Sequence, residues 1–133
     1  MGLKRILIVD DSDEFRAMLK NYLERQNLGI EIFEASTGEM GITKASCIRP
    51  HVVLMDVSLP KLNGLEALQQ IKFDHPDCCV IILTMFAVQK FKNEAKRIKA
   101  DDFIGKSEID ERLVPAIKKC FESANSAGHG KRR

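Results

Sequence analysis

The chain has 133 residues, of which 44% are hydrophobic and 30% are charged, as expected for one globular domain. Its apolar runs all fall short of the roughly 20 residues that a membrane helix needs, and its first residues turn acidic too early for a secretory signal peptide. We therefore expect a cytoplasmic protein with no membrane partner. The net charge of +2 is too small to predict nucleic-acid binding by the chain itself.

The four cysteines are Cys47, Cys78, Cys79 and Cys120, and they lack the spacing of a metal site. Cys78 and Cys79 begin an apolar run, so we expect them to point to opposite faces of a strand, where a bond between them would be strained. We expect all four thiols to be reduced and mostly packed as small hydrophobic side chains.

Five short apolar runs alternate with segments of helical periodicity. The runs, which we expect to be strands, are Arg5–Val9, Ile30–Phe33, Val52–Met55, Val80–Leu83 and Asp102–Ile104. The first, third and fourth are apolar throughout, which is typical of strands covered on both faces. The second alternates between apolar and polar residues, as an edge strand does.

Apolar residues at intervals of three and four predict five helices. The residues that carry this pattern are Phe15, Met18, Leu19, Tyr22 and Leu23 in the first helix, Met40, Thr43 and Cys47 in the second, Leu65, Leu68 and Ile71 in the third, Val88, Phe91, Ala95 and Ile98 in the fourth, and Leu113, Ala116, Ile117, Cys120 and Phe121 in the fifth. Ser12 and Ser107 are placed to cap the first and fifth helices. The pattern predicts an α/β domain over residues 1–122, with a doubly wound parallel sheet of (βα)5 type, and a polar tail over residues 123–133.

Unusual polar residues fall at the carboxyl ends of the predicted strands. Asp10 and Asp11 follow the first strand, Asp56 the third and Thr84 the fourth, while Lys106 comes shortly after the fifth. Doubly wound sheets bind ligands at this edge. Converging carboxylates repel one another unless a cation intervenes, and oxygen ligands suit Mg²⁺. With a lysine and a hydroxyl group to contact phosphate oxygens, the set indicates phosphoryl transfer.

These residues resemble the response-regulator receiver domains of two-component signalling. The similarity covers about Lys4 to Phe121. It rests on V-D-D-S at Val9–Ser12, D-V-S-L-P-K-L-N-G at Asp56–Gly64, L-T at Leu83-Thr84, and A-D-D-F-I-G-K at Ala100–Lys106. The resemblance implies a flavodoxin-like strand order of 2-1-3-4-5. It also implies a signalling switch that catalyses only its own phosphorylation and dephosphorylation.

The resemblance implies a role for each acidic residue. Asp56 would accept a phosphoryl group from the phosphohistidine of a sensor histidine kinase or a histidine phosphotransfer protein. Asp10, Asp11, Asp56 and the backbone carbonyl of Ser58 would bind Mg²⁺.

The resemblance also implies how the signal would leave the site. Thr84 and Lys106 would contact the phosphoryl oxygens, and Thr84 and Phe103 would move as the switch. The surface that changes would be the fourth helix, the fifth strand and the fifth helix, through which a homodimer could form.

Two questions stay open at this point. The first is whether the chain is a stand-alone receiver or a receiver cut from a transcription regulator, since Ser107 after Lys106 is tolerated in receivers attached to helix-turn-helix domains. The second is whether the chain is instead a small Mg²⁺-dependent phosphatase with an aspartyl-phosphate intermediate, because Asp11-Ser12-Asp13 matches the D-x-D pattern of such enzymes. That segment overlaps a predicted helix start, however.

Overall fold

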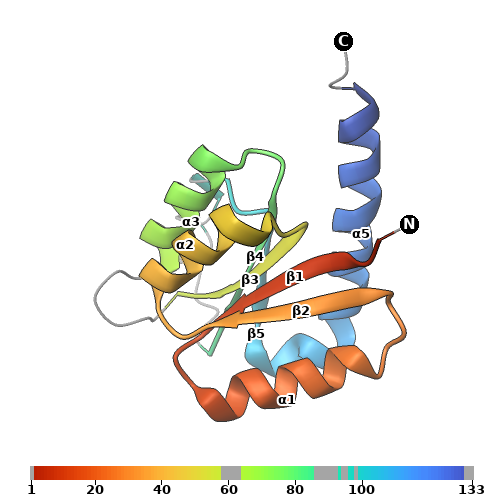
Figure 1. Ribbon diagram of the computed structural model, residues 1–133. Helices are drawn as coiled ribbons and strands as arrows, with labels where there is room; N and C mark the ends of the chain where they lie inside the picture. Colours follow the sequence, from red (N-terminus) through yellow and green to blue (C-terminus); the bar gives the residue numbers. More distant parts are fainter. Residues whose placement is uncertain (1, 58–63, 86–92, 94–95, 98, 131–133) are drawn as a thin grey trace.

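The computed structural model describes residues 2–57, 64–85, 93, 96–97 and 99–130. Its centre is a five-stranded parallel sheet in the order β2-β1-β3-β4-β5 (Figure 1). The strands are β1 (Lys4–Val9), β2 (Ile30–Ala35), β3 (Val52–Asp56), β4 (Cys79–Thr84) and β5 (Asp102–Gly105). The helices are α1 (Asp13–Glu24), α2 (Gly38–Ile48), α3 (Gly64–Asp74) and α5 (Ile109–Gly130), with a 3-10 turn η1 (Lys106–Glu108) before α5. The predicted α/β fold and strand order are confirmed.

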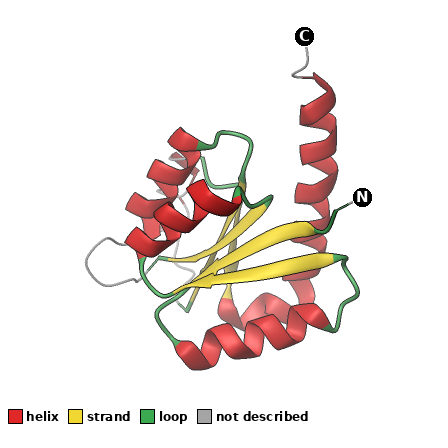
Figure 2. Ribbon diagram, viewed as in Figure 1, coloured by secondary structure: helices red, strands yellow, loops and turns green. Residues whose placement is uncertain are grey.

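Helices cover both faces of the sheet, with α1 and α5 on one face and α2 and α3 on the other (Figure 2). Successive side chains of a strand point to opposite faces, so Ile6 and Ile8 pack under α1 and α5 while Leu7 and Val9 pack under α2 and α3. This two-sided burial explains why β1, β3 and β4 are apolar throughout. Among the described residues, none forms a helix long and apolar enough to span a bilayer.

Of the two predicted helix caps, one is confirmed and the other is wrong. Ser12 caps α1, since its Oγ accepts a hydrogen bond from the backbone N–H of Phe15 at 3.1 Å. Ser107 does not cap α5, because it lies inside the turn η1 and the α-helix begins at Ile109. The carboxylate of Glu108 instead accepts a hydrogen bond from the backbone N–H of Gly105 at 3.2 Å. The predicted fourth helix falls largely outside the described residues.

The predicted buried face of α2 is wrong. The residues chosen for it, Met40, Thr43 and Cys47, are exposed, whereas Gly38, Gly41 and Ala45 are buried. Small residues let α2 approach β1 closely, and a Cβ added at Gly41 would lie 3.0 Å from a methyl carbon of Val9. A contact made by glycine and alanine leaves little hydrophobic signal in the sequence, which is why the periodicity pointed to the wrong face.

The helix α5 continues through Gly130, so the backbone of residues 123–130 is helical where the loss of periodicity predicted a tail. In Figure 1 this part of α5 projects past the edge of the sheet. The domain boundary at residue 122 remains a prediction.

The prediction that all four cysteines are reduced is wrong for one pair. Cys79 on β4 and Cys120 on α5 form a disulfide with a Cα–Cα distance of 6.0 Å. Cys78 and Cys79 do point to opposite faces, and Cys79 therefore meets the buried side of α5. Cys47 is an exposed free thiol and Cys78 a buried one. The bonded residues are 41 apart in sequence, so no local pattern joins them.

Candidate functional site

The candidate site lies at the carboxyl ends of the strands, where four elements bring their terminal polar residues together. Asp10 follows β1, Asp56 ends β3, Thr84 ends β4 and Lys106 follows β5, and these four strands are neighbours in the sheet. Asp10, Asp56 and Thr84 are each 5% exposed or less. Neighbouring parallel strands end at a common edge, so the sheet order alone gathers residues that are far apart in the sequence.

Three carboxylates form the acidic part of the site. One oxygen from each of Asp10, Asp11 and Asp56 can be chosen so that all three lie within 4.8 Å of one another. Opposite ligands of an octahedral Mg²⁺ site lie about 4.2 Å apart, given metal–oxygen distances of about 2.1 Å, so a small adjustment would suit that ion. The donors are all oxygens, and Asp11 is exposed to the water molecules that Mg²⁺ retains. The residues present therefore fit the predicted ion, while Ser58 lies outside the described residues.

Lys106 is the cation of the site. Its Nζ lies 2.8 Å from Oδ2 of Asp10 and 3.8 Å from Oδ2 of Asp56. The same Nζ lies 3.9 Å from the centroid of the Phe15 ring. One lysine beside three carboxylates leaves an excess of negative charge among these described side chains, which favours binding of a further cation.

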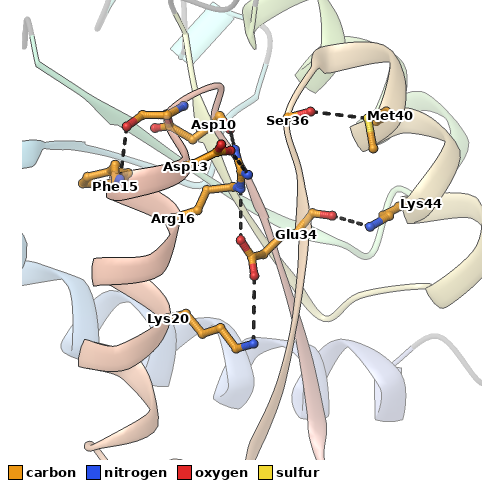
Figure 3. A network of polar contacts seen from close by, with 10 residues as sticks. Asp10, Asp13, Phe15, Arg16, Lys20, Glu34, Ser36, Met40 and Lys44 are labelled. Atoms are coloured by element: carbon orange, nitrogen blue, oxygen red, sulfur yellow. Dashed lines mark hydrogen bonds and ion pairs between the residues drawn. The ribbon is translucent and has the colours of Figure 1, made fainter.

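Arg16 fastens the first turn of α1 to the end of β1. Its Nη1 donates to the backbone carbonyl of Asp10 at 2.6 Å, its Nε donates to Glu34 at 3.0 Å, and its Nη2 pairs with Asp13 (Figure 3). Burial lowers the pKa of Arg16, but the hydrogen bonds to Asp13 and Glu34 outweigh it and raise the pKa above its ordinary value. Glu34 lies on β2 and also pairs with Lys20 at 3.9 Å. The clamp thus ties β1, β2 and α1 together next to the acidic cluster.

Gly64 is required where α3 begins. A Cβ at this position would lie 2.0 Å from the backbone oxygen of Asp56 and 2.6 Å from the Cα of Val57. The Gly64 N–H donates to the carbonyl of Val57 at 3.2 Å. No larger residue allows α3 to start so close to the end of β3. This contact gives a physical reason for the glycine that ends the nine-residue signature beginning at Asp56.

A sequence model of the response regulator receiver domain matches residues 6–118. The chain belongs to the response regulator receiver family. This receiver is 34% identical to the chemotaxis protein CheY of Thermotoga maritima over 117 residues, which are 87% of this chain and 96% of that protein. It is 31% identical to the response regulator protein VraR of Staphylococcus epidermidis over 118 residues, which are 89% of this chain and 56% of VraR.

A solved structure also resembles this receiver. The CheY-like response regulator receiver domain protein from Methanospirillum hungatei JF-1 matches it with a TM-score of 0.85 and 28% identity, covering 95% of this chain and 99% of that one. The receiver thus has nearly the length of CheY and corresponds to about half of VraR.

The two predicted switch residues lie on the same side of the receiver's sheet. Phe103 pairs in register with Ile82, so these two side chains point to the same face of the sheet. Thr84 is two residues beyond Ile82 on β4, and it therefore points to that face as well. Phe103 is half-buried and packs against the core beneath α2 and α3. The Lys106–Ser107 peptide bond is trans. Phe103 lies on the strand next to that of Thr84 and on the same face of the sheet, while its movement remains a prediction.

Phe15 and Arg16, which contact the site, were not identified as site residues from the sequence. The periodicity identified Phe15 only as a core residue, and Arg16 carried no recognised motif. Their one signal in the sequence is position, since both lie in the first turn after the acidic pair Asp10 and Asp11.

The phosphatase alternative, which rested on the D-x-D pattern, is not supported by the geometry. Asp13 is an exposed residue of α1 that pairs with Arg16 and lies outside the acidic cluster.

Proposed function

We propose that this receiver is the phosphoacceptor of a two-component phosphorelay and that Asp56 accepts the phosphoryl group. The observation that carries the proposal is a carboxylate only 5% exposed, with a lysine Nζ 3.8 Å away. Asp10 and Asp11 each offer a further carboxylate oxygen within 4.8 Å. Such charge concentration is costly to bury, and it becomes useful when a cation and a phosphoryl group enter the site.

The proposed reaction transfers one phosphoryl group. An oxygen of Asp56 forms a bond to phosphorus as the P–N bond of the partner's phosphohistidine breaks and its electron pair stays on the nitrogen. Because the phosphohistidine ring carries a proton on its other nitrogen, it leaves as a neutral imidazole, and an acyl phosphate remains on Asp56. Asp10, Asp11, Asp56 and the Ser58 carbonyl would hold Mg²⁺, which supplies charge neutralisation for the phosphoryl oxygens. Lys106 would move a short distance from Asp10 to pair with a phosphoryl oxygen, and the Thr84 hydroxyl group would donate to another.

The proposed output is a change in packing. When the Thr84 hydroxyl group turns toward the phosphoryl group, the space behind it opens for the Phe103 ring, which already packs on the same side of the sheet. The surface formed by the fourth helix, β5 and α5 would then differ between the two states. It could bind an output partner or a second copy of the chain. To change from mostly inactive to mostly active, the acyl phosphate must favour the second state by roughly 3–5 kcal/mol.

The proposed partners follow from the family. Receiver domains of response regulators interact with histidine kinases, and a sensor histidine kinase or a histidine phosphotransfer protein is the expected donor for this receiver, which we expect to be cytoplasmic. Because the chain corresponds to 56% of VraR and 96% of CheY, both a stand-alone receiver and the receiver of a longer regulator agree with the matches. Reading the gene beyond Arg133 for a helix-turn-helix segment distinguishes the two forms.

Acetyl phosphate and Mg²⁺ test the proposed function without a kinase. We expect intact-mass analysis to find one added phosphoryl group per chain, reached only with Mg²⁺, and no added mass in Asp56→Asn. A donor consumed in many turnovers per chain, with hydrolysis unaffected by Asp56→Asn, would instead indicate a phosphatase and refute the switch.

A further inference from the structure

The Phe15 ring and the Lys106 ammonium group meet inside the site although they are far apart in the sequence. Nζ lies 3.9 Å from the ring centroid, well within the roughly 6 Å at which a lysine is attracted to an aromatic face. The same Nζ lies 2.8 Å from Asp10 and 3.8 Å from Asp56. The ammonium group therefore has a carboxylate on two sides and an aromatic ring on a third.

The ring is held in place by its own helix turn. The backbone N–H of Phe15 donates to Ser12 Oγ at 3.1 Å, and Arg16, the next residue, binds the carbonyl of Asp10 at 2.6 Å (Figure 3). The side chain is half-buried and packs against the core layer between the sheet and α1 and α5. A ring fixed in this way offers a preformed surface to a lysine on a flexible four-carbon stem.

We propose that Phe15 is a positioning residue that holds the Lys106 ammonium group beside Asp56. Without the ring, Lys106 retains its carboxylate partners but loses the contact that fixes its third side. It can then turn fully toward Asp10 or into solvent, so a smaller fraction of molecules has Lys106 ready for an incoming phosphoryl group. The inference rests on the proposed phosphoacceptor function and adds to it a residue that acts through its contact with Lys106.

The chain offers a matched control for removing the ring. Lys4 Nζ lies 5.7 Å from the centroid of the Phe121 ring, which packs in the same core layer. Phe121→Leu therefore removes a half-buried phenylalanine and a lysine contact, as Phe15→Leu does, but away from the site. Phe15→Tyr retains an aromatic face and serves as the conservative variant.

The test compares labelling rates with acetyl phosphate at saturating Mg²⁺. We expect Phe15→Leu to slow labelling of Asp56 by roughly three- to thirty-fold, the range that corresponds to losing one lysine–aromatic contact. The Mg²⁺ dissociation constant should stay unchanged, because the metal ligands remain. Phe15→Tyr should label at a rate near wild type, and so should Phe121→Leu even if it lowers the unfolding temperature.

An NMR measurement checks the contact itself without relying on turnover. In the wild type, the ring current of Phe15 should shift the Lys106 Hε resonances upfield, and the shift should vanish in Phe15→Leu but persist in Phe15→Tyr and Phe121→Leu. Unshifted Lys106 resonances in the wild type, or equal labelling rates in Phe15→Leu and wild type, would overturn the inference alone. Failure of the wild type to take up phosphoryl would refute the proposed function, and this inference with it.

Discussion

The two edges of the sheet use polar residues in opposite ways. At the amino-terminal edge, cations meet acceptors one by one: the guanidinium of Arg5 donates to the carbonyls of Ile48 and Arg49, and Lys72 pairs with Asp101 at 2.8 Å. At the carboxyl-terminal edge, Asp10, Asp11 and Asp56 converge. Lys106 lies beside them and pairs with Asp10 and Asp56. Matched contacts stabilise a fold, whereas concentrated like charge prepares a site for an ion.

The contacts at the amino-terminal edge hold neighbouring elements of the fold together. Arg5 satisfies carbonyls at the end of α2, where a helix leaves acceptors unpaired. Asp101 also accepts a hydrogen bond from the backbone of Val80 at 2.7 Å, and the disulfide of Cys79 begins at the same end of β4. We therefore expect substitutions here to change stability, and substitutions of the acidic residues at the other edge to change binding.

The largest effect should come from breaking the Cys79–Cys120 disulfide. A bond between residues 41 apart restricts the unfolded chain, so reduction should lower the free energy of unfolding by about 3–4 kcal/mol. Urea unfolding of the wild type with and without dithiothreitol measures the difference. Burial raises the pKa of the neighbouring Cys78 thiol to about 12, so Cys78 should not exchange with the bond.

The Cys79→Ser/Cys120→Ser double variant controls this experiment, since its stability should be the same in both buffers. Cys47→Ser, which alters an exposed thiol, should behave as the wild type does. If the wild type unfolds at the same urea concentration with and without reductant, the disulfide does not stabilise the amino-terminal edge and this prediction is wrong.

The next effect tests what stabilises the carboxyl-terminal edge. Gly64→Ala would place a Cβ 2.0 Å from the Asp56 carbonyl oxygen, so α3 or the end of β3 must move. We expect the free energy of unfolding to fall by about 3 kcal/mol, as overpacking of a rigid contact does. Gly2→Ala, with nothing within 4 Å of its added Cβ, should leave stability unchanged. Equal stability of the two variants would remove the structural reason for glycine in this signature.

Asp10→Asn should not destabilise the fold, in contrast to the two changes above. The amide oxygen can still accept the hydrogen bond from Ser12 N–H that Oδ1 accepts at 2.9 Å, and Lys106 retains Asp56. Removal of one of three converging carboxylates relieves repulsion, so stability without Mg²⁺ should stay the same or rise by up to about 1 kcal/mol. Mg²⁺ affinity, measured by calorimetry, should fall at least about tenfold. A clear loss of stability would mean that this edge also depends on its charges for folding.

The smallest effect is the pH response of His51 at the amino-terminal edge. Burial, with the charges of Arg5 and Lys4, lowers the pKa of His51, and its Nδ1 accepts a hydrogen bond from the Arg5 N–H at 2.9 Å. The unfolded chain binds the proton more readily, so stability should decline as pH falls below about 6.5. His51→Asn retains an acceptor and should lose this part of the decline. An unchanged pH profile in that variant would show that another group causes it.

The sequence predicts the fold well because continuous apolar runs report burial on both faces, and because parallel strands must bring Asp10, Asp56, Thr84 and Lys106 to one edge. It fails where the determining contact leaves no periodic signal. The small residues of α2 concealed its buried face, and the Cys79–Cys120 bond joins distant segments. Phe15 illustrates the limit within the site, since its period identifies a core residue but gives no sign that Lys106 lies over its ring.

The position of the acyl phosphate tests the central claim most directly. Borohydride reduces an acyl phosphate to an alcohol, so treatment of the acetyl-phosphate-labelled chain should convert the modified aspartate into homoserine, which peptide mass spectrometry locates. We predict homoserine at position 56 in the wild type, only after labelling with Mg²⁺, and at no position in Asp56→Asn. Homoserine at another aspartate, or a labelled Asp56→Asn chain, would contradict the account.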